Sequence, residues 1–381
     1  MNKLWTSLIL SAAVGTAGVA AFLSARTSAP LEEPPLVIKV DPPREHQLID
    51  VVFALDTTGS MGGLLDGAKR TIFSIASHIK ETNGNASLRI GLVAYRDIYD
   101  DYVTRVFPMT EDIDSVFADL SQLTAGGGGD LPEHVNKALV DVLAMPWREK
   151  AAKMVFLVGD APPASRGDTP ESAALAEQAA ARQITINTVR CGGNAQTGVA
   201  WEQIASLAGG EYSSIAQDGG VREIATPYDA KMAELSRAID ESTIIYGDDG
   251  DRARYGRKMS AAAAAPASTA ASRADYFAYK GGGGRDSKDL TAEVAAGTVA
   301  LDSIDAAKLP TELRNLEGEA LKAEVKARAD KRAALQTELK ELSARRRAYL
   351  ADEAPAPASD EGSFDAEVAK TVDRTLAKPR N

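Results

Sequence analysis

The chain has 381 residues and a formal net charge of -11 at pH 7, and 44% of its residues are hydrophobic. This length allows two or three domains, or one domain with extensions. The acidic excess argues against nucleic acid as a partner, because phosphate binding needs an excess of Lys and Arg. A single cysteine, Cys191, excludes an intrachain disulfide, and the presence of only three histidines argues against zinc-hydrolase chemistry.

Residues 1–26 differ from the rest of the chain in composition. No charged residue lies between Lys3 and Arg26. The uncharged stretch is about long enough to span a bilayer, and we interpret it as a signal peptide or an N-terminal membrane anchor. The expected location is therefore outside the cytosol, either in the periplasm or anchored in the inner membrane and facing the periplasm. Residues 27–46 are expected to form a linker, because their prolines exclude a regular helix.

Residues 47–245 show apolar strand patterns that alternate with helical patterns. Strands are expected near residues 48–55, 88–95, 103–108, 153–159, 184–189 and 212–215. Helices are expected near residues 63–80, 112–123, 132–144, 171–183, 201–208 and 229–243. The pattern predicts an α/β domain with a doubly wound, mostly parallel sheet that is covered by helices on both faces. Pro132 is expected in the first turn of its helix, and the helix at 229–243 is expected to close the domain.

Residues 246–381 divide into three segments of different composition. Residues 246–310 are rich in small residues and are predicted to be a flexible, low-complexity linker. Residues 311–350 predict one long charged helix. Its apolar heptad seam comprises Leu321, Val325, Leu335, Leu339, Leu342 and Tyr349, whereas Arg328, Arg332 and Arg346 occupy other seam positions. This helix is a candidate coiled coil for self-association, and residues 351–381 are predicted to be a disordered tail.

Oxygen-bearing side chains follow the first predicted strand at alternate positions: Asp56, Thr58 and Ser60. One carboxylate and two hydroxyls from a single loop supply half of the ligands that a hard divalent cation needs. Gly59 allows the backbone to turn tightly enough to bring the three together. The alternative is that Asp56 caps the first helix and that the hydroxyls make local turn hydrogen bonds.

Asp-x-Thr-x-Ser after a buried strand resembles the metal-ion-dependent adhesion site (MIDAS) of the von Willebrand factor type A (VWA) domain, and the resemblance covers roughly residues 47–245. In that family, three loops at the C-terminal edge of a doubly wound sheet supply the metal ligands. The resemblance assigns the first loop to Asp56, Thr58 and Ser60. It assigns the third loop to Asp160, which follows the predicted strand at 153–159.

The middle loop departs from the family pattern. VWA domains usually present a threonine there after a Gly-Gly pair, but Gly129 stands at that place and Asp130 follows it. The Gly-Gly-Gly-Asp-x-Pro-Glu sequence resembles a VWA subgroup. We therefore predict that Asp130 takes the middle role, with Thr124 as the alternative.

The resemblance also implies a function. Mg²⁺, with Mn²⁺ or Ca²⁺ as alternatives, would be held with an open position that accepts an acidic side chain of a partner protein. The expected protein is a bacterial, non-catalytic, divalent-metal-dependent adhesion or scaffold protein of the cell envelope. Two alternatives stay open: a regulatory VWA subunit of an ATPase or chelatase-like complex, and a metal-free structural platform.

Overall fold

The structure is a computed structural model. It describes residues 47–84, 86–129, 131–167, 169–280, 284–353 and 362–377, which belong to one compact unit. The predicted export segment and linker at 1–46 lie outside the described residues, and so does Asp130. Within the described part of the chain, no helix is both long enough and apolar enough to cross a membrane.

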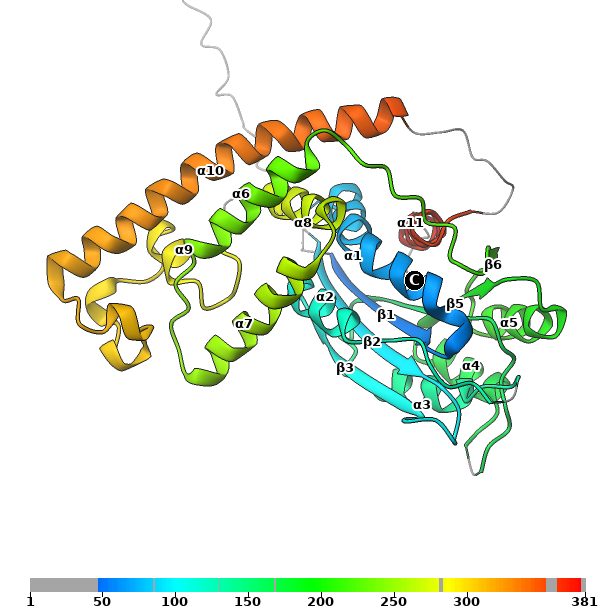
Figure 1. The fold of residues 1–381 in the computed structure, drawn as a ribbon. Coiled ribbons are helices and arrows are strands. Elements are labelled where there is room, and N and C mark those ends of the chain that lie inside the picture. Colours follow the sequence, from blue (N-terminus) through cyan, green and yellow to red (C-terminus); the bar gives the residue numbers. More distant parts are fainter. Residues whose placement is uncertain are drawn as a thin grey trace, which may run out of the picture. The chain divides into compact units, whose positions relative to one another are not determined.

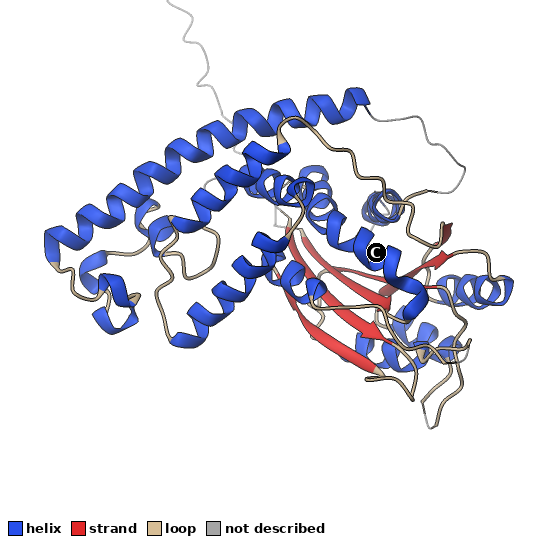
Figure 2. Ribbon diagram, in the orientation of Figure 1, coloured by secondary structure: helices blue, strands red, loops and turns tan. Residues whose placement is uncertain are grey.

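A six-stranded sheet lies at the centre of the fold, with the strand order β3-β2-β1-β4-β5-β6 (Figures 1 and 2). Its strands are β1 (Leu48–Asp56), β2 (Ser87–Tyr95), β3 (Thr104–Thr110), β4 (Ala152–Gly159), β5 (Ile184–Cys191) and β6 (Tyr212–Ile215). β3 is antiparallel to β2, and the other neighbours are parallel. The predicted α/β fold with a mostly parallel sheet is confirmed.

Helices cover both faces of this sheet (Figure 1). On one face lie α1 (Gly62–Thr82) and α2 (Ile113–Ser121), and their apolar residues share a core with β1 and β2. On the other face lie α3 (Val135–Ala144), α4 (Ser172–Ala181) and α5 (Ala195–Leu207). β1 is buried almost throughout because helices pack on both of its sides.

α3 begins later than the sequence predicts. Its N-cap is His134, so Pro132 does not lie in its first turn. The reason is that Glu133 is held in extended backbone: its N–H donates to Pro162 O (3.1 Å), and its carbonyl accepts from Ala164 N (2.8 Å). These bonds tie the segment before α3 to the loop after β4.

The helix predicted to close the domain has a different position. α6 (Asp229–Glu241) buries Met232, Leu235 and Ile239 in a cluster with α8 (Ala267–Lys280) and α10 (Gly318–Glu353). The sheet face beside α1 is instead covered by α11 (Phe364–Ala377) (Figure 1). The prediction of a disordered tail is therefore wrong for residues 364–377.

α11 packs through an apolar stripe. Phe364, Val368 and Val372 are spaced at i, i+4 and i+8, and all three belong to the core that contains β1 and β4. The backbone before the helix is also attached, because Phe364 N donates to Gly219 O at 2.9 Å. A fourteen-residue helix that buries this stripe is an integral part of the domain.

Most of the described residues between 246 and 310 form helices where a flexible linker was predicted. They contain α7 (Asp249–Ala264), most of which is polar or alanine, the helix α8, and α9 (Leu290–Ala295). Alanine is the strongest helix former, so the low-complexity composition favours helix once packing partners exist. Three short 3-10 turns follow at Leu301–Ser303, Ala306–Lys308 and Thr311–Leu313.

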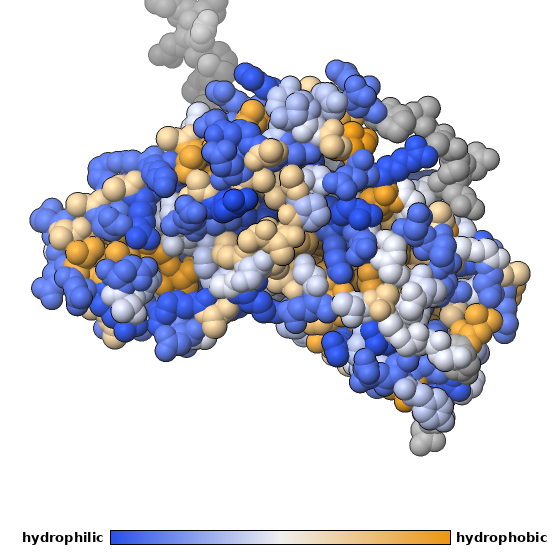
Figure 3. Space-filling view, viewed as in Figure 1, coloured by the Kyte–Doolittle hydropathy of each residue, from blue (hydrophilic) through white to orange (hydrophobic). Residues whose placement is uncertain are grey.

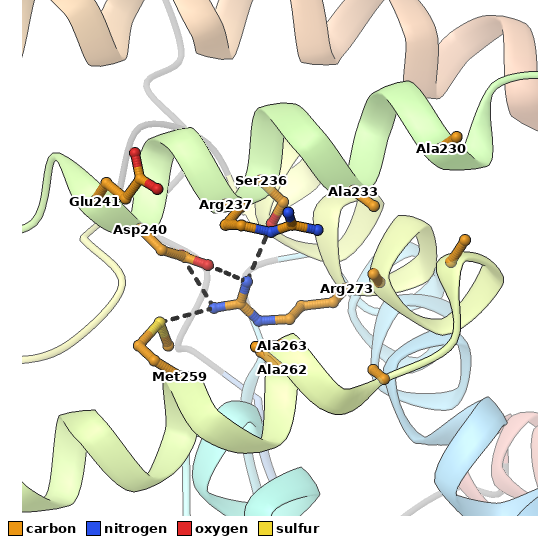
Figure 4. Close-up of a pocket in the computed structure, with 13 residues that line it drawn as sticks. Ala230, Ala233, Ser236, Arg237, Asp240, Glu241, Met259, Ala262, Ala263 and Arg273 are labelled. Atoms are coloured by element: carbon orange, nitrogen blue, oxygen red, sulfur yellow. Dashed lines mark hydrogen bonds and ion pairs between the residues drawn. The ribbon is translucent and has the colours of Figure 1, made fainter.

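Buried ion pairs hold these helices to the sheet domain. Lys258 of α7 is buried and donates to Asp112 at 2.7 Å, just before α2. Arg273 of α8 is buried as well and binds Asp114 of α2 through Nε at 2.7 Å. Figure 4 shows Arg273 reaching across an alanine-lined pocket toward Asp240 of α6, to which its Nη1 donates at 2.7 Å.

The long helix α10 starts at Gly318, seven residues after the predicted start. Its seam faces other helices of the same chain: Leu339 packs with α6 and α8, and Val325 belongs to a cluster with Leu290 of α9. Two of the three seam arginines are buried in ion pairs, Arg332 with Asp289 (2.7 Å) and Arg346 with Asp229 (2.8 Å). Much of the seam thus packs within the chain, with Leu321, Val325 and Leu339 buried, and self-association through this helix stays a prediction. Hydrophilic residues dominate the outer side of α10 in Figure 3.

Candidate metal centre

The first loop of the candidate site follows β1. Asp56 is the last residue of that strand, and the chain then enters a 3-10 turn, η1 (Gly59–Met61), before α1. Asp56 Oδ1 accepts hydrogen bonds from Thr58 N (2.8 Å) and from Thr58 Oγ1 (2.7 Å). Thr58 Oγ1 lies 3.5 Å from Ser60 Oγ. The three residues predicted for this loop therefore lie together.

Asp56 does not cap a helix, which was the alternative role considered for it. Neither η1 nor α1 receives a side-chain hydrogen bond at its N-cap position. Thr58 does make the local turn hydrogen bonds that this alternative expected, with Asp56 as the acceptor. Because Thr58 occupies only Oδ1, the second carboxylate oxygen is left for another partner.

The third loop brings Asp160 to the same edge of the sheet. β4 runs parallel to β1 with Leu55 opposite Val158, so the two strands end side by side. Asp160 Oδ2 accepts a hydrogen bond from Gln217 Nε2 at 2.7 Å. Gln217 also donates to Ser60 O at 3.3 Å and so links the first and third loops. Gln217 belongs to no recognised motif, so sequence reasoning missed it.

Gly159 leaves room for the Asp56 carboxylate. A Cβ atom at this position would lie 3.0 Å from Asp56 Oδ2 and 2.5 Å from Tyr95 Oη. Tyr95 Oη in turn donates to Val158 O at 3.2 Å. Any side chain at position 159 would therefore push directly on the carboxylate, which explains why β4 ends in glycine.

The burial of Asp56 favours a proton or a positive charge beside its carboxylate. The residue is fully buried, and its Oδ2 has no hydrogen-bond partner among the described residues. Burial raises the pKa of Asp56 to about 7, against the hydrogen bonds from Thr58. The charge of the nearby Asp160 raises this pKa further, whereas the backbone N–H of Asp160 lowers it. A buried carboxylate oxygen needs a proton, a hydrogen bond or a cation. The residues present fit a hard divalent cation.

The middle loop lies against the first. Gly59 N donates to Gly127 O at 3.3 Å, and Gly126 N donates to Thr57 O at 3.1 Å. Asp130, predicted as the middle ligand, lies outside the described residues and stays a prediction. Thr124, the alternative, is exposed, and its backbone carbonyl accepts a hydrogen bond from Arg96 Nη2 at 2.7 Å.

Glu133 is a further acidic residue at this edge that sequence reasoning left without a role. Its side chain is buried, with 3% of the residue exposed, and Oε2 has no described hydrogen-bond partner. Burial raises the pKa of Glu133 to about 9, and the carboxylates of Asp56 and Asp160 contribute to the rise. The available signal was its place at the end of Gly-Gly-Gly-Asp-x-Pro-Glu.

The acidic side chains do not converge on one point. Among the described residues, no group of three or more His, Cys, Asp or Glu side chains is placed to hold a metal ion. The oxygen atoms gathered at this edge are instead a mixture of carboxylates, the hydroxyls of Thr58 and Ser60, and backbone carbonyls.

Comparison with known proteins gives a consistent result. A family model described as "von Willebrand factor A domain" matches residues 50–227. The alpha-protein kinase vwkA of Dictyostelium discoideum is 27% identical over 121 residues, which are 31% of this chain and 19% of that protein. A putative ariadne-like RING finger protein, R811, of Acanthamoeba polyphaga mimivirus is 31% identical over 116 residues, which are 30% of this chain and 11% of that protein.

The matches thus span less than a fifth of either relative. Among solved structures, the SpRpn10 VWA domain is similar at a TM-score of 0.35 and 15% identity, over 45% of this chain and 89% of that one.

Proposed function

Because residues 50–227 form a von Willebrand factor A domain, we propose that this protein is a non-catalytic adhesion or scaffold protein that binds its partner through a divalent cation. VWA domains are typically non-catalytic interaction modules, and this domain supports a protein-interaction role. To this interaction role we add two proposals: that binding depends on a metal ion, and that the partner contributes an acidic side chain.

The fully buried Asp56 carboxylate carries this proposal. It has one oxygen without a partner, and the hydroxyls of Thr58 and Ser60 stand beside it. We assign these three residues and Asp160 to a Mg²⁺ ion, with Asp130 as the expected ligand from the middle loop. Mn²⁺ or Ca²⁺ could replace Mg²⁺, since both accept oxygen ligands.

The bound cation would supply a positively charged open position for an acidic side chain of the partner protein. Mg²⁺ retains several waters when few protein ligands are available, and one such water can be exchanged for a carboxylate. The site lies beyond the carboxyl ends of β1 and β4, where open α/β sheets generally bind ligands.

The proposed location is the bacterial cell envelope. The uncharged stretch at 4–25 supports export to the periplasm, or anchoring in the inner membrane with the domain facing the periplasm. Fractionation of cells that express the full-length chain tests this directly. Recovery in the cytosolic fraction would refute the proposed envelope location. It would favour the alternative of a regulatory subunit in an ATPase complex.

Calorimetric titration of the full-length chain with MgCl₂ tests the metal site. The wild type should give a saturable binding isotherm, and Asp56→Ala should give none. Asp66→Ala removes an exposed carboxylate on α1 and should bind as the wild type does. A flat trace for the wild type would refute the metal site. Partner capture that persists in EDTA would indicate the metal-free platform instead.

A further inference from the structure

Glu133 lies outside the ligand positions that the family resemblance assigns, yet the structure fixes it firmly at the metal edge. Its backbone forms an isolated parallel bridge with Pro163. Its N–H and carbonyl bind Pro162 and Ala164 in the loop that follows Asp160. The position of Glu133 is therefore tied to the third loop as well as to the middle loop.

The side chains of Glu133 and Thr58 both lie beside Gly128, on the side where a side chain at that position would point. A Cβ atom at Gly128 would be 3.5 Å from Glu133 Oε1 and 3.2 Å from Thr58 Cβ. Gly128 has a φ of 84°, which favours glycine. Because Gly128 has no side chain, Thr58 and the Glu133 carboxylate both border the space beside it, and the carboxylate therefore lies close to the first loop.

Most other acidic side chains at this edge already have partners. Asp97 Oδ1 accepts from Arg166 Nε at 3.1 Å, Asp100 Oδ1 accepts from Gly128 N at 3.1 Å, and Asp160 Oδ2 accepts from Gln217. Asp56 and Glu133 are different, because each keeps a buried carboxylate oxygen without a described hydrogen-bond partner. Each of these buried oxygens needs a proton, a hydrogen bond or a cation, and one cation at this edge would serve both.

We propose that Glu133, in place of Asp130, is the residue of the middle loop that completes the metal site, by holding a water molecule bound to the cation. The described carboxylates do not converge closely enough to hold an ion directly, and a water-mediated role agrees with this spacing. Mg²⁺ keeps several of its waters in proteins. Carboxylates of the outer shell fix such ligands and are worth about 10- to 100-fold in metal affinity.

This inference rests on the proposed metal site and goes beyond it. It assigns Glu133 the part that the family gives to a threonine, and it adds negative charge to the site. A cation held with the help of Glu133 would present less positive charge to an acidic partner. The site would hold its metal more tightly and its partner more weakly than one completed by a neutral hydroxyl.

The test is calorimetric titration of the full-length chain with MnCl₂ and MgCl₂. Glu133→Gln should lower the affinity by about 10- to 100-fold. Its free energy of unfolding without metal should stay unchanged or rise, because glutamine resembles the protonated acid. Glu177→Gln removes an exposed carboxylate of α4 and should bind metal as the wild type does. This combination separates a role in metal binding from a merely structural one.

The outcomes are distinguishable. If the wild type binds no metal, the proposed function fails and this inference fails with it. If the wild type binds metal and Glu133→Gln binds equally well, only this inference is refuted, and Asp130→Asn then tests the alternative ligand. If Glu133→Gln does not fold, Glu133→Asp decides: an affinity lowered severalfold supports the role, and an unchanged affinity overturns it.

Discussion

The ring of Phe364 in α11 lies 6.0 Å, centroid to centroid, from the ring of Phe53 in β1. The last described helix thus packs against the first described strand. Phe53 also stacks on Phe156 of β4 at 5.4 Å, so Phe364 extends an aromatic cluster at the centre of the sheet. The domain contains this helix even though the family match ends at residue 227.

Replacing Phe364 with alanine should therefore destabilise the whole sheet domain. Loss of a fully buried phenylalanine typically costs about 3 to 5 kcal/mol, from lost burial and the remaining cavity. Lys370→Ala changes an exposed position on the same helix and should stay within about 0.5 kcal/mol of the wild type. Urea unfolding followed by circular dichroism measures both variants. Equal stability of the two would show that α11 does not contribute to the core.

Arg332→Met should be strongly destabilising. Arg332 is buried, and its Nη1 donates to the buried Asp289 at 2.7 Å. Removing one partner of a buried ion pair leaves the other charge unpaired and costs about 3 to 5 kcal/mol. Lys326→Met breaks an exposed pair with Asp330 on the same helix and should cost at most about 1 kcal/mol. Chemical unfolding compares the two; a small loss for Arg332→Met would contradict the buried pair.

Gly128→Ala and Gly129→Ala form a matched pair of variants in the middle loop. Gly128 has a positive φ, and a Cβ atom there would meet Thr58 and Glu133, whereas a Cβ atom at Gly129 meets nothing within 4 Å. Gly128→Ala should cost about 1 to 3 kcal/mol in stability through backbone strain and should weaken Mg²⁺ binding. Gly129→Ala should be nearly neutral in both unfolding and calorimetric measurements. Similar behaviour of the two variants would argue against the described loop geometry.

Stability should fall in acid partly because of Asp50. Burial alone would raise the pKa of Asp50, but hydrogen bonds from Arg89 and Arg148 outweigh it and hold that pKa below 3.8. The unfolded chain then binds the proton more readily than the folded protein. The stabilisation is therefore present above about pH 4 and is lost as the pH falls through the lowered pKa.

Asp50→Asn should remove this part of the acid dependence. Urea unfolding between about pH 6 and pH 3 measures the change, with Asp66→Asn on the exposed face of α1 as a control. If the free energy of unfolding falls as steeply with decreasing pH in Asp50→Asn as in the wild type, other carboxylates cause the effect.

Cys191 should be unreactive in the folded protein. It is the only cysteine of the chain, and it is fully buried at the end of β5. Burial raises the pKa of its thiol well above the ordinary value, and nearby carboxylates such as Asp56 act in the same direction. Since the thiolate is the reactive form, iodoacetamide should label the native protein very slowly and the urea-unfolded protein rapidly. Rapid labelling under native conditions would show that β5 opens locally.

The sheet and its nearest helices could be predicted because their signal is local. β1 and β4 are continuous apolar runs followed by turn residues, and α1 carries a regular apolar stripe. The start of α3 could not be predicted in the same way, because backbone bonds from Glu133 to a loop some 30 residues away decide it. A proline at position 132 suits a helix start in isolation, but the tertiary contacts override it.

The helices after residue 229 were harder to predict because charge pairs position them. Lys258 and Asp112 lie 146 residues apart in sequence, and Arg273 and Asp114 lie 159 apart. No periodic pattern reveals such partners in advance. In the sequence, Arg332 and Arg346 weaken the predicted apolar seam because they are charged. In the structure, each is buried in an ion pair with an aspartate from another part of the chain. The stripe of Phe364, Val368 and Val372 is a local helix signal in the sequence. It was overlooked because the composition of residues 351–381 suggested disorder.

The position of α11 has a consequence for the order in which the protein can be made. β6 leaves the ribosome long before Phe364 does, because residues 216–363 are synthesised between them. At the usual rate of translation this interval is on the order of 10 s. Throughout it, one face of β4 lacks its covering helix. The nascent sheet therefore carries an exposed apolar surface that only the final helix removes, and folding of the domain is expected to finish late and to depend on protection from aggregation until then.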